Sequence, residues 1–302
     1  MHFSVVITTK DRLDFLKRAV RSILLNSILP TDVVIVNDGG SPVYIEDLHE
    51  IEIPSGNQVD FKIINNSESM GGNKARNLGV SVASSDIIFL LDDDDSFVSN
   101  GFESRLKFFN DPSVGIVFTG INLVKSSNLN AVVRKVFPLD SKDYYVDLLK
   151  KGNLIGSTSR VAIRKEYFYS AGQFDENLSS FQDFDLWIRM SRISKVKNDS
   201  AIGVNYTIHD TKACRQISSS YTKYINSGEY LVGKYYKSTE MLGASSQFES
   251  TILFRVSQSA SSVSYRKKML FGLQAFKKSP SLKKFIFSLL PHFLVVRIYP
   301  FV

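Results

Sequence analysis

Four consecutive aspartates, at positions 92–95, directly follow a run of five apolar residues at 87–91. An apolar run of this length, rich in Ile and Phe, is typical of a strand that is buried on both faces. Because an unpaired buried charge is very costly, the carboxylates must lie at the exposed carboxyl end of that strand. Neighbouring like charges repel each other, and a divalent cation bound by carboxylate oxygens relieves this repulsion. The stretch therefore predicts a metal and phosphate site; its simpler alternative is a solvated acidic turn.

Three strands and two helices are expected before the acidic run. Apolar segments predict strands at 3–9, 32–37 and 59–64, and apolar residues at three- and four-residue spacing predict helices at 13–24 and 73–82. Such alternation of strands and helices is typical of a parallel, doubly wound sheet. We therefore expect an α/β fold in which the carboxyl ends of the strands share one edge.

Polar side chains follow every one of these strands. They are Thr8, Thr9, Asp38, Asn65 and Asn66, in addition to the four aspartates. We expect the ligand of this domain to bind among them, because open α/β sheets hold their ligands outside the carboxyl ends of the strands.

The remainder of the chain is less regular. Its patterns predict strands at 114–124, 131–137 and 154–163, helices at 144–150 and 182–193, and a helical region from about residue 218. We interpret the chain as an α/β domain over 1–215 and a helical, basic amphipathic region over 216–302.

The net charge of +7 is unevenly distributed. After Glu249 the sequence has no acidic residue but nine lysines and arginines, so the first 249 residues carry 7 − 9 = −2. This asymmetry argues against nucleic acid as a partner of the acidic edge. It predicts instead that the C-terminal region meets an anionic surface.

Two apolar stripes run through that basic region. They consist of Tyr265, Met269, Leu273 and Phe276, and of Leu282, Phe285, Ile286, Leu289 and Leu290. Basic amphipathic helices of this kind bind at membrane surfaces, but helices that cap a core with solvated lysines have the same pattern. Pro291 and Arg297 interrupt the last apolar stretch, which is too short and too broken for a membrane-spanning helix.

The single cysteine, Cys214, cannot form an intrachain disulfide, and the N-terminus lacks the pattern of a secretory signal. Both features suit the reducing cytoplasm. Together with the basic tail, they predict a cytoplasmic protein that is peripheral at the inner face of the cell membrane.

Six segments, in this order and spacing, resemble family 2 glycosyltransferases of the GT-A fold, the type that builds bacterial cell-surface polysaccharides. They are VVITTKDR at 5–12, VNDG at 36–39, GNKARNLG at 72–79, the aspartates at 92–95, AGQFDE at 171–176 and QDFDLW at 182–187. Each segment alone is a weak signal, whereas the ordered set is specific. The resemblance implies a doubly wound, mostly parallel sheet with a helical C-terminal appendage.

Such enzymes take a sugar from a nucleotide-diphosphate sugar, which a divalent cation helps to bind through an Asp-x-Asp signature. The resemblance implies Asp94 as the metal ligand and Asp92 or Asp93 as contacts to the donor. Because four acids stand in a row, Asp95 stays open as an alternative. Hard carboxylate oxygens suit Mn2+ or Mg2+, which would neutralise charge on the leaving nucleoside diphosphate.

Three further residues are expected to contact the donor. Asp38 resembles the family's nucleobase contact, although an Asx-turn before Gly39 is an equally good local interpretation. Thr8 lies beside it at the end of the first strand, and Arg76 is expected to reach the base or the diphosphate as a fixed cation. The donor is expected to be a UDP-sugar, while a TDP-sugar or a GDP-sugar stays open.

Asp183 resembles the catalytic base of inverting transfer, which takes a proton from the acceptor hydroxyl as its oxygen attacks the anomeric carbon. The family usually has an acid just before this position, where this chain has Gln182. His209, near the end of the matched region, would be a further metal ligand or a structural histidine. The acceptor is expected to be a saccharide on a lipid carrier.

Two other classes of function remain as alternatives. A nucleotidyltransferase would share the sheet, the metal and the nucleotide, but it typically has a glycine-rich basic loop where this chain has TTKDR at 8–12. A non-catalytic sugar-nucleotide-binding or membrane-associated module would have a degenerate site. The presence of Asp38, Asp94 and Asp183 together argues against it.

Overall fold

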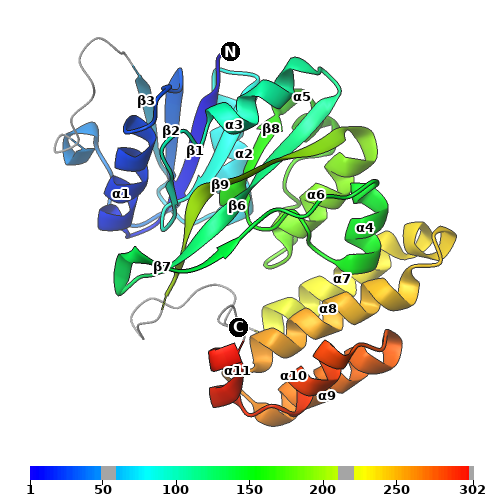
Figure 1. Cartoon of the computed structure of the whole chain (residues 1–302). Helices are drawn as coiled ribbons and strands as arrows, with labels where there is room; N and C mark the ends of the chain where they lie inside the picture. Colours follow the sequence, from blue (N-terminus) through cyan, green and yellow to red (C-terminus); the bar gives the residue numbers. More distant parts are fainter. Residues whose placement is uncertain (49–58, 210–220, 299–302) are drawn as a thin grey trace. The chain divides into compact units, whose positions relative to one another are not determined.

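The computed structural model describes residues 1–48, 59–209 and 221–298 (Figure 1). The chain splits into two compact units. The first contains residues 1–140, 155–176 and 189–210, and the second contains 141–154, 177–188 and 211–302. Cys214 and the expected domain boundary at 215/216 lie outside the described residues.

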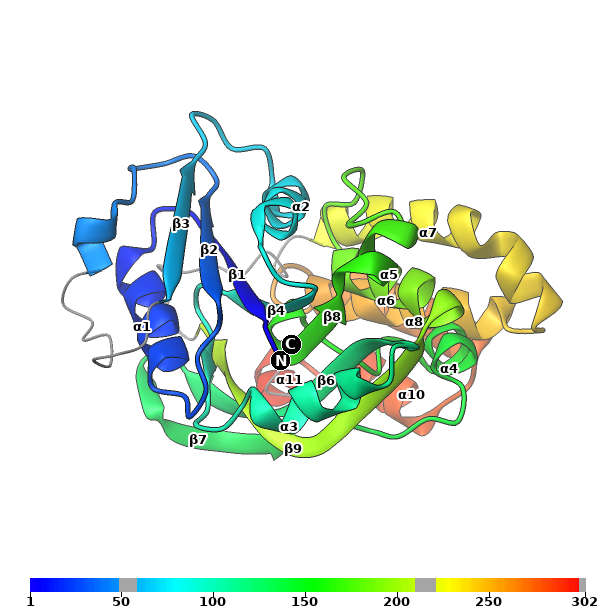
Figure 2. The ribbon, with the colours of Figure 1, turned by 90° about the horizontal axis from the view of Figure 1, so that it is seen from above.

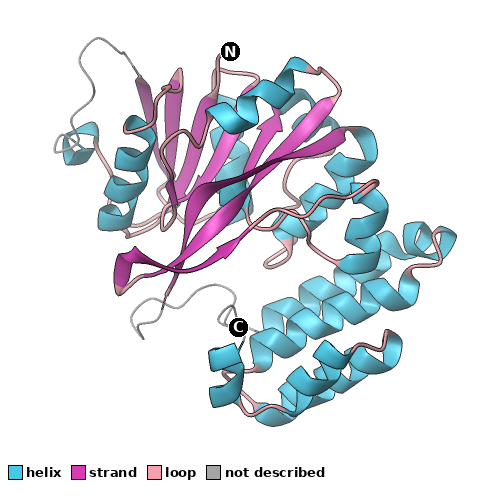
Figure 3. Ribbon diagram, in the orientation of Figure 1, coloured by secondary structure: helices cyan, strands magenta, loops and turns pink. Residues whose placement is uncertain are grey.

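A single sheet of nine described strands forms the centre of the first unit (Figure 3). Its order is β3-β2-β1-β4-β8-β6-β9-β5, and β7 pairs with β6 outside this path. The first four strands in the sequence pair in parallel; they are β1 (Ser4–Thr9), β2 (Asp32–Asn37), β3 (Asp60–Asn65) and β4 (Ile87–Asp92). The predicted α/β fold with a doubly wound, mostly parallel sheet is confirmed.

The other half of the sheet is mixed. Its strands are β5 (Ser96–Phe97), β6 (Val114–Lys125), β7 (Asn128–Val136), β8 (Val161–Arg164) and β9 (Lys195–Ile208). Strand β6 is parallel to β9 and antiparallel to β7 and β8, and β8 is antiparallel to β4. Through β8, the mixed half therefore joins the parallel half at β4.

The strand predicted at 154–163 is wrong over residues 154–160. Gly156 has a φ of +92°, in the left-handed region that an extended strand does not use, and Thr158–Arg160 form a short 3-10 helix. Strand β9 was not predicted, because polar side chains break its apolar pattern and Ser200 interrupts it with a φ of +56°.

The helices α1 (Leu13–Leu24) and α2 (Gly72–Val82) cover opposite faces of the parallel strands (Figure 2). Helix α1 packs in the cluster that contains Val5 and Ile7, whereas α2 lies against Val6, whose side chain points to the other face. A Cβ atom at Gly79 would lie 2.4 Å from Cγ1 of Val6, so a glycine is required for this close approach of helix and strand.

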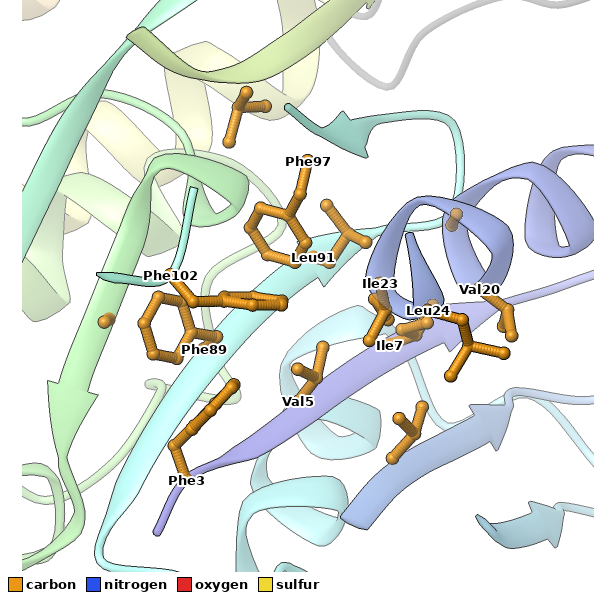
Figure 4. Packing of buried hydrophobic residues seen from close by; sticks show 14 of the residues in the cluster. Phe3, Val5, Ile7, Val20, Ile23, Leu24, Phe89, Leu91, Phe97 and Phe102 are labelled. Atoms are coloured by element: carbon orange, nitrogen blue, oxygen red, sulfur yellow. The ribbon is translucent and has the colours of Figure 1, made fainter. Parts of the chain in front are cut away.

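Aromatic side chains fill the core beside β4, next to the aliphatic residues that pack under α1 (Figure 4). Phe3, Phe89, Phe97 and Phe102 meet with ring centroids 4.7 to 6.2 Å apart, mostly edge to face. Shorter helices complete the unit; they are α3 (Glu103–Leu106), α5 (Lys165–Ser170), and the 3-10 turns Ile45–Leu48 and Lys107–Asn110.

The second unit is helical. It contains α4 (Tyr144–Lys151), the first turns of α6 (Gln182–Ile193), and α7 (Tyr221–Met241), α8 (Ser245–Ala260), α9 (Tyr265–Lys278), α10 (Leu282–Leu289) and α11 (His292–Ile298). Helix α8 contacts α4, α7 and α9 and is the centre of this unit. In the described ranges, none of the helices combines the length and the apolar character that crossing a bilayer requires.

Candidate functional site

The polar residues that follow the parallel strands meet at one edge of the sheet. Strand pairing places Thr9 beside Asn37, Asn37 beside Asn65, and Thr8 beside Asp92. The predicted convergence of these strand ends is confirmed. This edge provides the scaffold on which the candidate site is built.

A carboxylate and an imidazole lie in contact at this edge. Nε2 of His209 is 2.7 Å from Oδ2 of Asp94, and the buried His209 ring packs edge-on against Phe15. Arg12 donates from Nη1 to the same Asp94 oxygen at 3.0 Å. Burial alone would raise the pKa of Asp94, but the hydrogen bond from His209 and the charge of Arg12 outweigh it and lower that pKa. Asp94 is therefore held as a carboxylate.

The aspartates on either side of Asp94 are buried. Asp93 accepts a hydrogen bond from Arg12 at 3.1 Å, and burial together with the nearby charge of Asp94 raises its pKa to about 6. Asp95 accepts from the amide of Thr207 in β9 at 2.8 Å, and its complete burial raises its pKa well above the usual range. Asp95 thus faces β9, which leaves Asp94 as the acid in contact with His209.

Asp92 is more exposed than Asp93 and Asp94, with 27% of its side-chain surface accessible against 6% and 16%. Arg76 donates to Asp92 from Nη2 at 2.7 Å, and the hydroxyl of Thr158 donates to it at 2.9 Å. Arg76 is therefore fixed at the edge of the sheet rather than solvated as an isolated charge.

Asp38 holds the loop that leads into α2. Its two carboxylate oxygens accept from the amides of Met70 at 2.8 Å and Gly71 at 2.9 Å, and from the side chains of Ser69 at 2.8 Å and Asn66 at 3.3 Å. Burial opposes ionisation, but these hydrogen bonds prevail and lower the pKa of Asp38. A nucleobase contact at Asp38 stays a prediction, and it would require exchange of one of these four donors.

Helix α2 also fixes the turn at 172–176. Asn77 exchanges hydrogen bonds with the backbone of Phe174, both at 3.0 Å, and Asn73 donates to the carbonyl of Asp175 at 2.7 Å. Asp175 therefore takes part in this turn through its backbone carbonyl. The amides Asn73 and Asn77 are structural residues that the sequence pattern did not single out.

Asp183 belongs to the second unit, in the first turn of α6. Its Oδ2 accepts a hydrogen bond from Asn153 at 3.1 Å, and its Oδ1 accepts from the amide of Phe184 at 2.7 Å. The side chain is partly exposed. These contacts orient the carboxylate, and its role as a base stays a prediction.

Two neighbours of Asp183 on α6 anchor the helix. Asp185 is fully buried, with Lys234 Nζ at 2.8 Å and the hydroxyl of Tyr235 at 2.8 Å from its Oδ1. Trp187 is fully buried as well. Asp185 therefore anchors the helix through its ion pair, and Trp187 through its packing.

The residues at the edge fit a divalent cation. Within the part of the chain that the structure describes, no three His, Cys, Asp or Glu side chains are grouped as a complete metal site. The contact between Asp94 and His209 instead offers one hard oxygen and one imidazole nitrogen, which suits Mn2+ or Mg2+ when phosphate oxygens supply further ligands. This donor set matches a cation that binds together with a phosphorylated ligand.

Two arginines of the edge were not predicted. Arg12 bridges Asp93 and Asp94, and Arg18 donates to the carbonyl of Asp94 and to the hydroxyl of Thr207 at 2.8 Å. In the sequence pattern alone, both arginines are simply charged residues between the apolar positions of the first helix. The sequence could have indicated Arg12 as a residue of the site, because it directly follows the polar end of the first strand.

Carboxylates and an imidazole at the carboxyl ends of parallel strands define a ligand-binding α/β domain of the kind that holds nucleotides. The glycosyl transferase family 2 model matches residues 4–171, which is more than half of the chain. The chain belongs to this family and is accordingly a glycosyltransferase.

Curated relatives agree with this assignment. An uncharacterized glycosyltransferase of Bacillus subtilis, YwdF, is 28% identical over 70% of this chain and 75% of its own length. An uncharacterized glycosyltransferase of Haemophilus influenzae is 22% identical over 95% of this chain and 94% of its own. Another, from Rickettsia felis, is 24% identical over 72% of this chain, which corresponds to 36% of its own length.

Solved structures show the same fold. S. aureus TarS 1-349 superposes with a TM-score of 0.52 at 14% identity, covering 94% of this chain and 89% of that one. Its complex with UDP gives a TM-score of 0.53 at 13% identity, with the same coverage. The likeness establishes the GT-A fold for this chain.

Proposed function

We propose that this protein is an inverting glycosyltransferase that moves a sugar from a nucleotide-diphosphate sugar, a UDP-sugar, to a hydroxyl of a saccharide. The observation that carries the proposal is the contact between Asp94 and His209 at the edge of the parallel strands. A TarS structure of the same fold was solved with UDP and another with UDP-GlcNAc, which supports a uridine nucleotide as the carrier.

The donor is proposed to lie along the strand ends, held by side chains that are already fixed there. Asp92 contacts the sugar-nucleotide, and its exposure favours it over the buried Asp93 for this role. Arg76 offers a positive charge to the diphosphate, while Asp38 and Thr8 lie at the ends of the two strands proposed to flank the base.

Asp94 and His209 are the proposed protein ligands of Mn2+ or Mg2+. When bound, the cation supplies positive charge that stabilises the leaving nucleoside diphosphate. Arg12 contacts both Asp93 and Asp94 and Arg18 lies beside them, so the chain offsets part of the negative charge at the edge and a cation would offset more of it.

Asp183 is the proposed base. The acceptor oxygen forms the new bond to the anomeric carbon, its proton passes to the Asp183 carboxylate, and the old bond's electron pair leaves with the nucleoside diphosphate. Asn153 holds the carboxylate by a hydrogen bond that also survives in the protonated acid, because the carbonyl oxygen can still accept.

The acceptor is proposed to be a saccharide on a lipid carrier, and the enzyme is proposed to work at the inner face of the cell membrane. The support is the charge asymmetry of the chain, whose last acidic residue is Glu249. A basic C-terminal region favours contact with anionic lipid, where such acceptors are displayed.

A thermal-shift screen of nucleotide sugars tests the proposed donor. With Mn2+, one UDP-sugar present at about a hundred times its Kd is expected to raise the Tm by about 5 °C. The same sugar without a divalent cation is expected to give a much smaller shift. TDP- and GDP-sugars serve as controls for the base. A folded protein that responds to none of the donors would contradict the proposed function and favour a non-catalytic module.

A further inference from the structure

Helix α10 turns a lysine inward. Phe287 and Ser288 are its buried residues, and Lys284 lies beside them, partly buried. Lys284 donates from Nζ to the hydroxyl of Ser250 at 2.7 Å and to the carbonyl of Ser279 at 3.0 Å. A surface helix ordinarily turns its lysines to water and its apolar residues to the core. The inner side of α10 is therefore unusually polar.

Helix α9 shows the same arrangement. Lys268 is fully buried, donates to the carbonyl of Leu290, and has its Nζ 4.8 Å above the centroid of the Phe287 ring. Two lysines of the basic region are thus used inside the second unit. For Lys268 and Lys284, the expectation of solvated lysines that cap a core is wrong.

Four of the five apolar residues of α10 are on the outside, and Phe287 is the buried one. Leu282 is 74% exposed, Phe285 41%, Ile286 42% and Leu289 44%, and their spacing places them along one side of the helix. Phe293, in the next helix α11, is 71% exposed. We call the four exposed apolar residues of α10 the α10 apolar face. Exposed apolar side chains grouped in this way mark an interaction surface.

The exposed charges of α9 and α10 are positive. Arg266, Lys267, Lys277 and Lys283 are exposed, and Lys283 directly follows the first residue of the face. The sequence supplies no acid after Glu249, so no carboxylate of α9, α10 or α11 can neutralise them. Apolar residues flanked by lysine and arginine match the boundary between anionic headgroups and acyl chains.

We infer that the α10 apolar face inserts into an anionic membrane surface, with the neighbouring lysines and arginines on the lipid phosphates. A second copy of the chain is the less suitable occupant. A two-fold contact through this face would bring identical basic segments together without any acid from the same region. The inference deepens the proposed function, because it names the surface through which a lipid-linked acceptor would be met.

Binding to lipid vesicles tests the inference. The full-length protein is expected to sediment with vesicles of phosphatidylglycerol and phosphatidylcholine, and to do so less at high salt. A variant with Leu282→Ser, Phe285→Ser and Leu289→Ser is expected to bind these vesicles at least about tenfold more weakly. Point substitutions are preferable to deletion of 265–302, which would remove the buried Lys268 and Phe287.

The matched control replaces apolar residues of the first unit that are equally exposed. Leu25→Ser, Val132→Ser and Val133→Ser, at positions that are 70%, 45% and 48% exposed, are expected to leave vesicle binding unchanged. Equal Tm values and an unchanged donor-induced thermal shift would show that both variants are folded and that donor binding does not depend on the α10 apolar face.

Two outcomes would overturn the inference. In one, the α10 variant binds anionic vesicles as well as the unmodified protein does. In the other, light scattering shows a dimer that the α10 variant converts to a monomer, while neither protein binds vesicles; the face would then belong to a second copy. Since donor binding is measured without vesicles, a failure of the proposed function would be seen separately.

Discussion

Asp94→Ala is expected to lower kcat/KM for sugar transfer by about a thousandfold in a protein that remains folded. The substitution removes the carboxylate that His209 and Arg12 both contact, at 2.7 and 3.0 Å. Asp94 would act through the cation that it is proposed to hold, and loss of one such group that stabilises developing negative charge typically costs a hundredfold to a thousandfold in rate. Steady-state transfer measured against Mn2+ concentration, and Mn2+ binding followed by electron paramagnetic resonance in the presence of UDP, would check this prediction.

The control for this variant is Asp14→Ala. Asp14 is an exposed acid in the first turn of α1, so its loss changes the net charge equally without touching the acidic edge. Transfer by this control should equal that of the unmodified enzyme. If Asp94→Ala kept both transfer and its dependence on Mn2+, the metal ligand would have to be sought at Asp92 or Asp93.

Asp183→Asn is expected to reduce turnover by a factor of about 10² to 10⁴ and to leave the Kd of the donor unchanged. The amide keeps the shape of the side chain, and its one carbonyl oxygen can still accept one of the two hydrogen bonds, from Asn153 or from the amide of Phe184, but it cannot take up the proton of an acceptor hydroxyl. Turnover at saturating acceptor and calorimetric donor binding separate the two effects. Near-normal turnover would place the base elsewhere.

Asp185→Asn is the informative comparison, because it lies two residues further along the same helix. Its carboxylate is buried and paired with Lys234 at 2.8 Å, so its neutralisation leaves a poorly compensated ammonium. Breaking such a pair costs about 3 kcal/mol. This variant is therefore expected to lose thermal stability, whereas Asp183→Asn is expected to keep it.

The parallel half of the sheet could be predicted because its signals are local. Each strand is a short apolar run, and the alternation of strands and helices determines that the strand ends share an edge. Asp38, Asp92 and Asp94 could be placed at that edge for the same reason. No long-range information is needed when the periodicity of the sequence already defines the topology.

The internal arrangement of the edge could not be predicted in the same way. Asp95 is buried because β9 lies beside it, and β9 has an irregular pattern that does not reveal a strand. Arg12 compensates Asp93 and Asp94 across more than eighty residues of sequence. In α10, periodicity identifies an apolar side, but it does not say that this side faces outward while Lys284 faces inward.

Helix α6 belongs to both units, and this affects where a chimera of two such chains can be joined. The helix begins in the second unit with Asp183 and ends in the first unit, and Asp185 contacts Lys234 and Tyr235 of α7. A chimera that takes residues 211–302 from a relative would replace Lys234 and Tyr235 while keeping the helix that carries Asp183 and Asp185. Replacing 141–154 and 177–188 as well, rather than making one cut after the sheet, would exchange all three segments of the helical unit together with the contacts among them.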